Sequence, residues 1–208
     1  CACSDFFPFG QKHMLVMHTH QPYSKCQYYI GQYRNERFYP EVNEQISHLG
    51  SMLAGPETLI DGAGRRLFWG WIAEARATGS YGWNSIMTVP WHFIPTSDNR
   101  LQIHPVEELK NLRYNQQNVP DVSLSAQEER AIDGLASDCM ELQMTIDPGE
   151  AQRFGLKLLC SPNCEEETVI IYDHGQKEFV IDFEKASTNE ELVYPCGRYG
   201  QPLTSGNL

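Results

Sequence analysis

The chain has 208 residues, 41% of them hydrophobic and 21% charged, which is enough for one large domain or two small ones with a buried core. Its 16 Lys and Arg against 27 Asp and Glu give a net charge of −11, which disfavours nucleic acid as a partner and favours a neutral ligand such as a sugar. No apolar run approaches the roughly 18 residues of a membrane-spanning helix, so we expect no membrane-spanning segment.

Short apolar segments separated by turn residues dominate the first half of the chain. Such segments are typical of β-strands, and the turn at 61–64 (Asp-Gly-Ala-Gly) directly precedes one of them. We expect strands over residues 13–20, 27–31, 66–72, 83–89 and 99–103. Helical periodicity is confined to one turn at 105–113 and a short piece at 125–132.

The second half changes character. Residues 140–146 alternate between apolar and polar side chains, and 154–159 follow as a second strand. Residues 168–172 and 178–183 face each other across a four-residue turn and predict a hairpin. The sequence therefore predicts an all-β chain, with a propeller, sandwich or barrel as the possible architectures of the first half and a sandwich in the second.

Seven cysteines cannot all pair within the chain, and none of their spacings gives the two close pairs of a zinc ribbon. His18 and His20 lie at i and i+2 on one strand face, but no third ligand is near in sequence. We therefore expect no metal and no cofactor.

The opening segment carries the most specific signal. It reads Cys1-Ala2-Cys3-Ser4-Asp5-Phe6-Phe7 and runs into the strand at 13–20. It resembles the Glu-Cys-Pro-Asp-Phe-Phe signature of glycoside hydrolase family 32, the family of invertases, levanases and inulinases.

Three further segments resemble the family in the same order. Residues 54–61 (Ala-Gly-Pro-Glu-Thr-Leu-Ile-Asp) are similar to its Tyr-Ala-Pro-Gln-Thr/Ser-Phe-x-Asp segment. Residues 64–71 match its Gly-Arg-Arg-…-Gly-Trp strand, and 105–113 look like the segment that leaves its propeller. Residues 1–115 resemble the family by motif, and 120–208 by character alone.

The resemblance implies part of a five-bladed β-propeller followed by a β-sandwich. We expect propeller blades over 1–112, a linker over 113–120 and an incomplete sandwich over 121–208. It also implies retaining hydrolysis of β-fructofuranosides such as sucrose, inulin or levan, a reaction that needs two carboxyl groups about 5–5.5 Å apart.

The sequence departs from the family at these carboxyl groups. The family's acid/base Glu aligns with Ala2, whose methyl group cannot donate a proton. The family's Trp-x-Asn-Asp-Pro and Arg-Asp-Pro motifs do not occur, and the one Asp-Pro, at Asp147, follows an expected strand as a turn would. We therefore expect this chain alone not to hydrolyse its substrate.

The resemblance assigns sugar contacts to a small set of positions. An aromatic ring suits the apolar side of a furanose, which makes Trp71 a candidate sugar contact, with a core tryptophan of an inner strand as the alternative. The expected substrate-binding residues are Cys3, Asp5, Thr19, His20 and Trp71.

Several alternatives follow from these observations. The sequence opens on Cys1 without an initiator methionine or signal-peptide pattern, so we expect the C-terminal part of an enzyme, with a degenerate relative as the alternative. A non-catalytic carbohydrate-binding or scaffold protein would need only aromatic platforms such as Trp69, Trp71 and Trp83. An incomplete propeller would also expose strand edges, which predicts association with the missing blades or self-association. Extracellular and cytoplasmic locations both fit.

Overall fold

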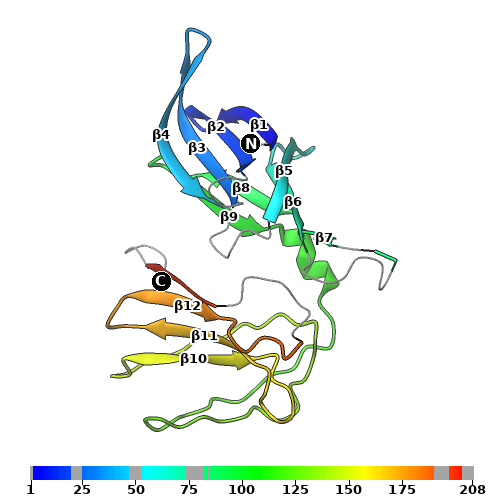
Figure 1. The fold of residues 1–208 in the computed structure, drawn as a ribbon, viewed down its shortest axis with the longest axis vertical. Helices are drawn as coiled ribbons and strands as arrows, with labels where there is room; N and C mark the ends of the chain where they lie inside the picture. The colour runs from blue at the N-terminus through cyan, green and yellow to red at the C-terminus, as the bar shows by residue number, and fades with distance from the viewer. Residues whose placement is uncertain are drawn as a thin grey trace. The chain divides into compact units, whose positions relative to one another are not determined.

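The computed structural model describes residues 2–19, 25–46, 53–73, 82–83, 85–189 and 197–202. The chain divides into two compact units, Cys1–Tyr114 and Asn115–Leu208 (Figure 1). Within the described residues, thirteen strands and one 3-10 helix make up the regular structure, and every strand pair is antiparallel.

The first sheet of unit 1 is a four-stranded meander. It runs in the order β1 (Ala2–Phe9), β2 (Lys12–Thr19), β3 (Lys25–Arg34) and β4 (Arg37–Gln45). Two-residue loops join its outer hairpins. Gly10 (φ 59°) starts the loop between β1 and β2, which is the positive φ that a type II′ turn needs at its first central position.

The second sheet of unit 1 has the same meander order with one interruption. It runs β5 (Leu53–Ile60), β6 (Arg66–Ile72), β8 (Trp91–Pro95) and β9 (Leu101–Pro105), and β7 (Ile86–Met87) pairs with the end of β6. The 3-10 helix η1 (Glu107–Leu112) follows β9. Two successive four-stranded antiparallel meanders are the pattern of propeller blades.

The core of unit 1 lies between these two sheets. Alternation along β2 buries Met14, Val16 and His18, while His13, Leu15 and Met17 are only partly buried. Phe68 and Phe93, from the second sheet, stack at 4.8 Å between ring centres and are almost fully buried. The described core residues from both sheets are Phe7, Phe9, Met14, Val16, Cys26, Tyr28, Ile30, Leu53, Phe68 and Phe93.

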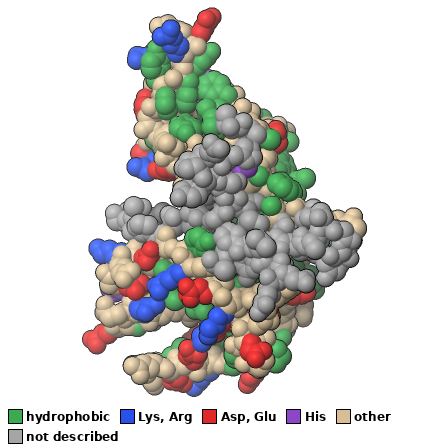
Figure 2. Space-filling view, viewed as in Figure 1, with side chains coloured by type: hydrophobic (Ala, Val, Ile, Leu, Met, Phe, Trp, Pro, Cys, Tyr) green, Lys and Arg blue, Asp and Glu red, His purple; other side chains and the backbone are tan. Residues whose placement is uncertain are grey.

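The opposite face of the first sheet carries an exposed aromatic cluster. Phe6 stacks on His13 at 5.3 Å and makes edge contacts with Tyr33 at 5.3 Å and Phe38 at 5.2 Å. Figure 2 shows hydrophobic side chains gathered over this sheet, whereas acidic and basic side chains mix over unit 2.

Unit 2 contains one sheet in its described residues. Its strands are β10 (Arg153–Leu158), β11 (Thr168–Asp173), β12 (Glu178–Asp182) and β13 (Arg198–Pro202), in that order. The predicted hairpin is confirmed, with Tyr172 opposite Phe179. Within this hairpin the side chain of Val180, on β12, is fully buried.

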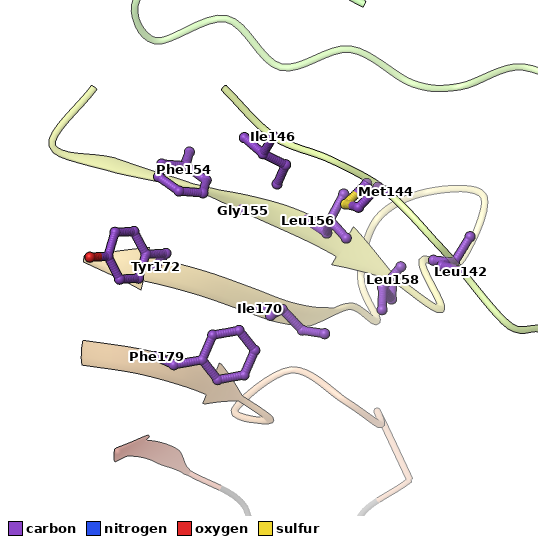
Figure 3. Close-up of a pocket in the computed structure, with 10 residues that line it drawn as sticks. All are labelled: Leu142, Met144, Ile146, Phe154, Gly155, Leu156, Leu158, Ile170, Tyr172 and Phe179. Atoms are coloured by element: carbon purple, nitrogen blue, oxygen red, sulfur yellow. The ribbon is translucent and has the colours of Figure 1, made fainter. Parts of the chain in front are cut away.

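Two expected strands are largely wrong. Of the described residues in 83–89, Ile86–Met87 pair with β6 as a strand and the Thr88 amide donates to the Gly70 carbonyl at 2.8 Å, while residue 84 lies outside the described part. The ladder breaks because the Thr88 hydroxyl accepts from the Gly70 amide at 3.1 Å, and Pro90 follows. Residues 140–146 join no ladder, although the side chains of Leu142, Met144 and Ile146 lie toward β10 (Figure 3).

Both expected helices are corrected as well. The piece at 105–113 is a six-residue 3-10 helix, because its carbonyls bond three residues on: Leu109 N donates to Val106 O at 3.1 Å. The piece at 125–132 is only a turn. The Ser125 amide donates to the Glu128 carboxylate at 2.8 Å, which closes one loop without continuing it.

Candidate functional site

The strand that carries the opening motif is bulged. Ala2 lies opposite His18 and Asp5 opposite Val16, so three steps along β1 match two along β2. Within this bulge Cys3 has φ 49°, a left-handed conformation that is uncommon for residues other than glycine. Bulges and such backbone conformations gather at functional sites, because they redirect side chains.

The first strand of the second sheet repeats this bulge. Ala54 lies opposite Trp71 and Glu57 opposite Trp69, again three steps against two. Gly55, with φ 56°, takes the place that Cys3 has in β1. Trp71 lies opposite the residue before the bulge in the second sheet, as His18 does in the first sheet. The two residues therefore occupy equivalent register positions.

Trp71 is the aromatic side chain best placed to meet a ligand beside these bulges. Its side chain is 50% exposed, whereas Trp69 is partly buried. A Cβ built on Gly55 would lie 4.0 Å from the Cβ of Trp71, so the bulged backbone passes beside it. The site thus offers an open aromatic surface next to the bulged backbone at Gly55.

The other expected contacts differ in what the structure describes. Cys3 is exposed with a free thiol, and the Thr19 hydroxyl donates to the Lys25 carbonyl at 3.4 Å. His20 and the side chain of Ala2 lie outside the described residues. The described geometry therefore brings together Cys3 and Asp5 in one bulge, with Thr19 at the end of the neighbouring strand, and Trp71 beside the second bulge.

Asp5 has a protein partner that comes from the other sheet. The Thr58 hydroxyl, on β5, donates to Asp5 Oδ2, and Arg66 Nη1 donates to Thr58 Oγ1 at 3.0 Å. The Arg66 guanidinium also lies 4.0 Å from the centre of the Phe7 ring. Burial lowers the pKa of Arg66, and the nearby Asp5 carboxylate opposes that shift.

Thr58 and Arg66 are the residues that sequence reasoning missed. Both stand inside quoted motifs, 54–61 and 64–71. Thr58 is 53 residues from Asp5 in the sequence, and the contact forms between two sheets. The sequence therefore gives no sign that the two residues meet. The one available signal was the charge of Arg66 on an otherwise apolar strand.

Unit 2 holds an apolar cavity of about 350 Å³ (Figure 3). Leu142, Met144 and Ile146 line it from the extended segment, and the sheet side includes Phe154 and Tyr172. Among the described residues that line it, Tyr172 carries the one titratable group, and none carries a carboxylate, amine or thiol, so a carboxylate pair of the kind that retaining hydrolysis needs is absent from this lining.

The described residues hold neither a metal-ligand cluster nor a membrane-spanning helix. Across 2–19, 25–46, 53–73, 82–83, 85–189 and 197–202, no three His, Cys, Asp or Glu side chains gather as metal ligands would. No helix in the same residues is long and apolar enough to cross a membrane.

Two family models match the chain and together cover nearly all of it. The model of the glycosyl hydrolases family 32 N-terminal domain matches residues 1–105, and that of the family 32 C-terminal domain matches 108–204.

Curated relatives support the same assignment. A sucrose-6-phosphate hydrolase from Zymomonas mobilis is 22% identical over 206 residues, covering 93% of this chain and 40% of that protein. A fructan 1-exohydrolase from Hordeum vulgare is 26% identical over 237 residues, covering 91% of this chain and 39% of that protein. The chain thus spans about two fifths of the length of these relatives.

Solved structures show the fold. A sucrose-6-phosphate hydrolase from Lactobacillus gasseri is 15% identical with a TM-score of 0.68, covering 97% of this chain and 43% of that one. A β-fructofuranosidase from Bombyx mori, solved with sucrose, is 15% identical with a TM-score of 0.63, covering 89% of this chain and 40% of that one. The all-β expectation, with propeller blades followed by a β-sandwich, is confirmed.

Proposed function

The chain belongs to glycosyl hydrolase family 32, and from that membership we propose that it supplies part of the sugar site of a β-fructofuranosidase. The substrate class is sucrose or a fructan of the inulin or levan type. The carrying observation is the half-exposed Trp71 beside the bulge at Gly55, in the sheet next to the bulge that holds the opening motif.

Each expected contact other than Asp5, whose carboxylate accepts from the Thr58 hydroxyl, has a proposed task at the sugar. The indole of Trp71 packs against the apolar side of a fructosyl ring, as aromatic rings do in apolar contacts. Cys3, Thr19 and His20 line the remainder of the subsite, following the family positions that they match. The Thr19 hydroxyl retains acceptor capacity for a sugar hydroxyl after donating to Lys25.

Catalysis is a separate matter, because retaining hydrolysis requires two carboxyl groups. One forms the glycosyl–enzyme bond, and the other protonates the leaving oxygen and then activates water. Ala2, which aligns with the second of these, cannot transfer a proton, and the nucleophile motif does not occur in the sequence. We propose that this chain binds fructosyl groups without cleaving them by itself.

Calorimetric titration of the 208-residue chain tests the proposal. The ligands are sucrose and short inulin and levan oligosaccharides, with glucose as the control. Binding of the fructosyl ligands without binding of glucose, and no release of free fructose during incubation, is the expected result. Equal binding of glucose, or no binding of any fructosyl ligand, would contradict it.

A second candidate function is a non-catalytic carbohydrate-binding protein. The observation that favours it is an alanine, Ala2, at the place where the motif resemblance expects the acid/base glutamate. The substitution Ala2→Glu, made in the longest natural form of the protein, distinguishes the two candidate functions. A gain of fructose release supports the glycosidase, and unchanged inactivity with retained binding supports the binding protein.

A further inference from the structure

One polar cluster of unit 1 joins its two sheets beside the candidate site. It consists of Asp5 on β1, Thr58 on β5 and Arg66 on β6, linked by the two hydrogen bonds through the Thr58 hydroxyl. We call these three residues the clamp. All three side chains are partly buried.

The clamp lies directly beyond both bulges. Asp5 is the residue at which β1 resumes its register with β2 after the bulge at Cys3. Thr58 follows Glu57, the residue at which β5 resumes its register with β6 after the bulge at Gly55. A single hydrogen bond therefore ties together the downstream ends of the two bulges.

Joining the two sheets through the clamp has an unfavourable desolvation free energy. Arg66 Nε is buried and finds no hydrogen-bond partner among the described residues, and leaving such a group unpaired is unfavourable. Partly buried charges also lose hydration that apolar side chains would not lose. Apolar side chains would hold the two sheets together with a smaller loss of hydration free energy. Stability alone therefore does not account for this polar arrangement.

What the clamp can supply is a fixed backbone. The left-handed conformation of Cys3 is strained, and strained residues persist only where the surroundings hold them. We propose that Asp5, Thr58 and Arg66 are positioning residues that fix both bulges, and through them the acid/base position at residue 2 and the aromatic surface of Trp71. The statement that the bulges position a sugar site rests on the proposed function. The statement that the clamp restrains the two bulges does not depend on the proposed function.

Variants of the full chain test the clamp. Thr58→Val removes the hydroxyl at nearly constant volume, and Asp5→Asn replaces the charged acceptor of that hydroxyl by a neutral amide, which accepts a weaker hydrogen bond. Thr58→Ser restores the hydroxyl. Glu41→Gln is the matched control, because it breaks the Lys12–Glu41 ion pair of 2.5 Å in the same sheet, away from the bulges.

The first readout is the NMR chemical shifts of the Cys3 and Gly55 backbones. Thr58→Val and Asp5→Asn are expected to move both resonances, while Thr58→Ser and Glu41→Gln leave them as in the wild type. If Thr58→Val fails to fold, Asp5→Asn decides. The proposal would be overturned if Thr58→Val and Asp5→Asn changed the chemical shifts of Cys3 and Gly55 no more than Glu41→Gln does. It would also be overturned if Thr58→Ser changed these chemical shifts as much as Thr58→Val does.

The second readout is affinity for inulin oligosaccharides. Displaced bulges are expected to weaken it on the order of tenfold in Thr58→Val, with recovery in Thr58→Ser. Moved resonances with unchanged affinity would show that the clamp does not position the site. If the wild type binds no fructosyl ligand, the proposed function fails, and the resonances of Cys3 and Gly55 still decide whether the clamp holds the bulges.

Discussion

The guanidinium of Arg65 donates two hydrogen bonds to the carboxylate of Glu108, at 2.6 Å from Nη2 to Oε1 and 3.1 Å from Nη1 to Oε2. The same guanidinium donates from Nε to Asp61 Oδ2 at 2.8 Å. The turn before β6 is thereby joined to η1, the helix that follows the last strand of the second sheet. Such a two-point geometry is specific to arginine.

Replacing Arg65 by Lys is expected to loosen η1. A lysine ammonium cannot reproduce both bonds to Glu108 and the bond to Asp61, yet the pair is exposed to solvent, so the loss is small. We expect a fall of on the order of a few degrees in the melting temperature, measured by circular dichroism. Glu107→Gln, which removes the exposed Lys110 pair of the same helix, is the control and should change less. A fall in Glu107→Gln that equals the fall in Arg65→Lys would argue against a special role for the two-point contact.

The same contact gives acid sensitivity with a defined sign. Hydrogen bonds from the Arg65 side chain lower the pKa of Glu108 from its ordinary 4.5, and those from the Arg65 backbone and side chain lower the pKa of Asp61 from 3.8. The unfolded chain therefore binds protons at a higher pH than the folded chain does. The stability from these groups is present above the ordinary values and is lost as the pH falls through the lowered ones.

Carboxyl NMR titration checks this pH dependence. In Arg65→Met the pKa of Glu108 should return toward 4.5, because its main partner is gone. Asp61 should recover only in part, because the backbone amide at position 65 still donates to it at 2.8 Å. Asp98, whose pKa is lowered chiefly by the Thr96 hydroxyl, is the internal control. An unchanged Glu108 titration in Arg65→Met would contradict the assigned cause.

The cysteines are expected to differ sharply in reactivity. Burial raises the pKa of the Cys26 thiol to about 12, and the side chain is fully buried between the two sheets of unit 1. The thiolate is the reactive form, so at pH 8 Cys26 should resist alkylation in the native chain. The exposed Cys3, Cys139 and Cys164 should react. Iodoacetamide labelling followed by peptide mass spectrometry measures this, and labelling of Cys26 at the rate of Cys139 before denaturation would refute it.

Strand prediction succeeded where apolar side chains run between clear turns. The predicted strand at 66–72 has the observed bounds of β6, because an apolar stretch follows the Asp-Gly-Ala-Gly turn. The strands β1, β4, β5, β8 and β13 were missed. The bulge at Cys3 disrupts the alternation of β1, and β4 is a mostly exposed, polar edge strand with Pro40 at a register shift.

The candidate site was predictable as motifs but not as geometry. The opening motif and Trp71 could be read from residue types, because the family resemblance names them. The left-handed conformation of Cys3 could not, since it depends on the pairing of β1 with β2. The clamp depends on packing between two sheets, which residue spacing along one chain does not encode.

Trp71 is expected to carry much of any affinity for fructosyl ligands. Trp71→Ala should weaken binding of inulin oligosaccharides by on the order of tenfold or more, because it removes the aromatic surface beside the bulge. The fold should lose little, within about 1 kcal/mol of unfolding free energy, because half of the side chain already faces solvent. Trp71→Phe, which keeps an aromatic face, should restore part of the affinity.

Trp83→Ala is the matched comparison for this prediction, because Trp83 is 52% exposed and is also a tryptophan. Titration calorimetry on both variants separates the contributions of these two exposed tryptophans. If Trp83→Ala abolishes binding and Trp71→Ala does not, the sugar surface lies away from the paired bulges. The register equivalence of Trp71 with His18 would then be a feature of sheet construction alone, because nothing at the bulge of β5 would contact the ligand.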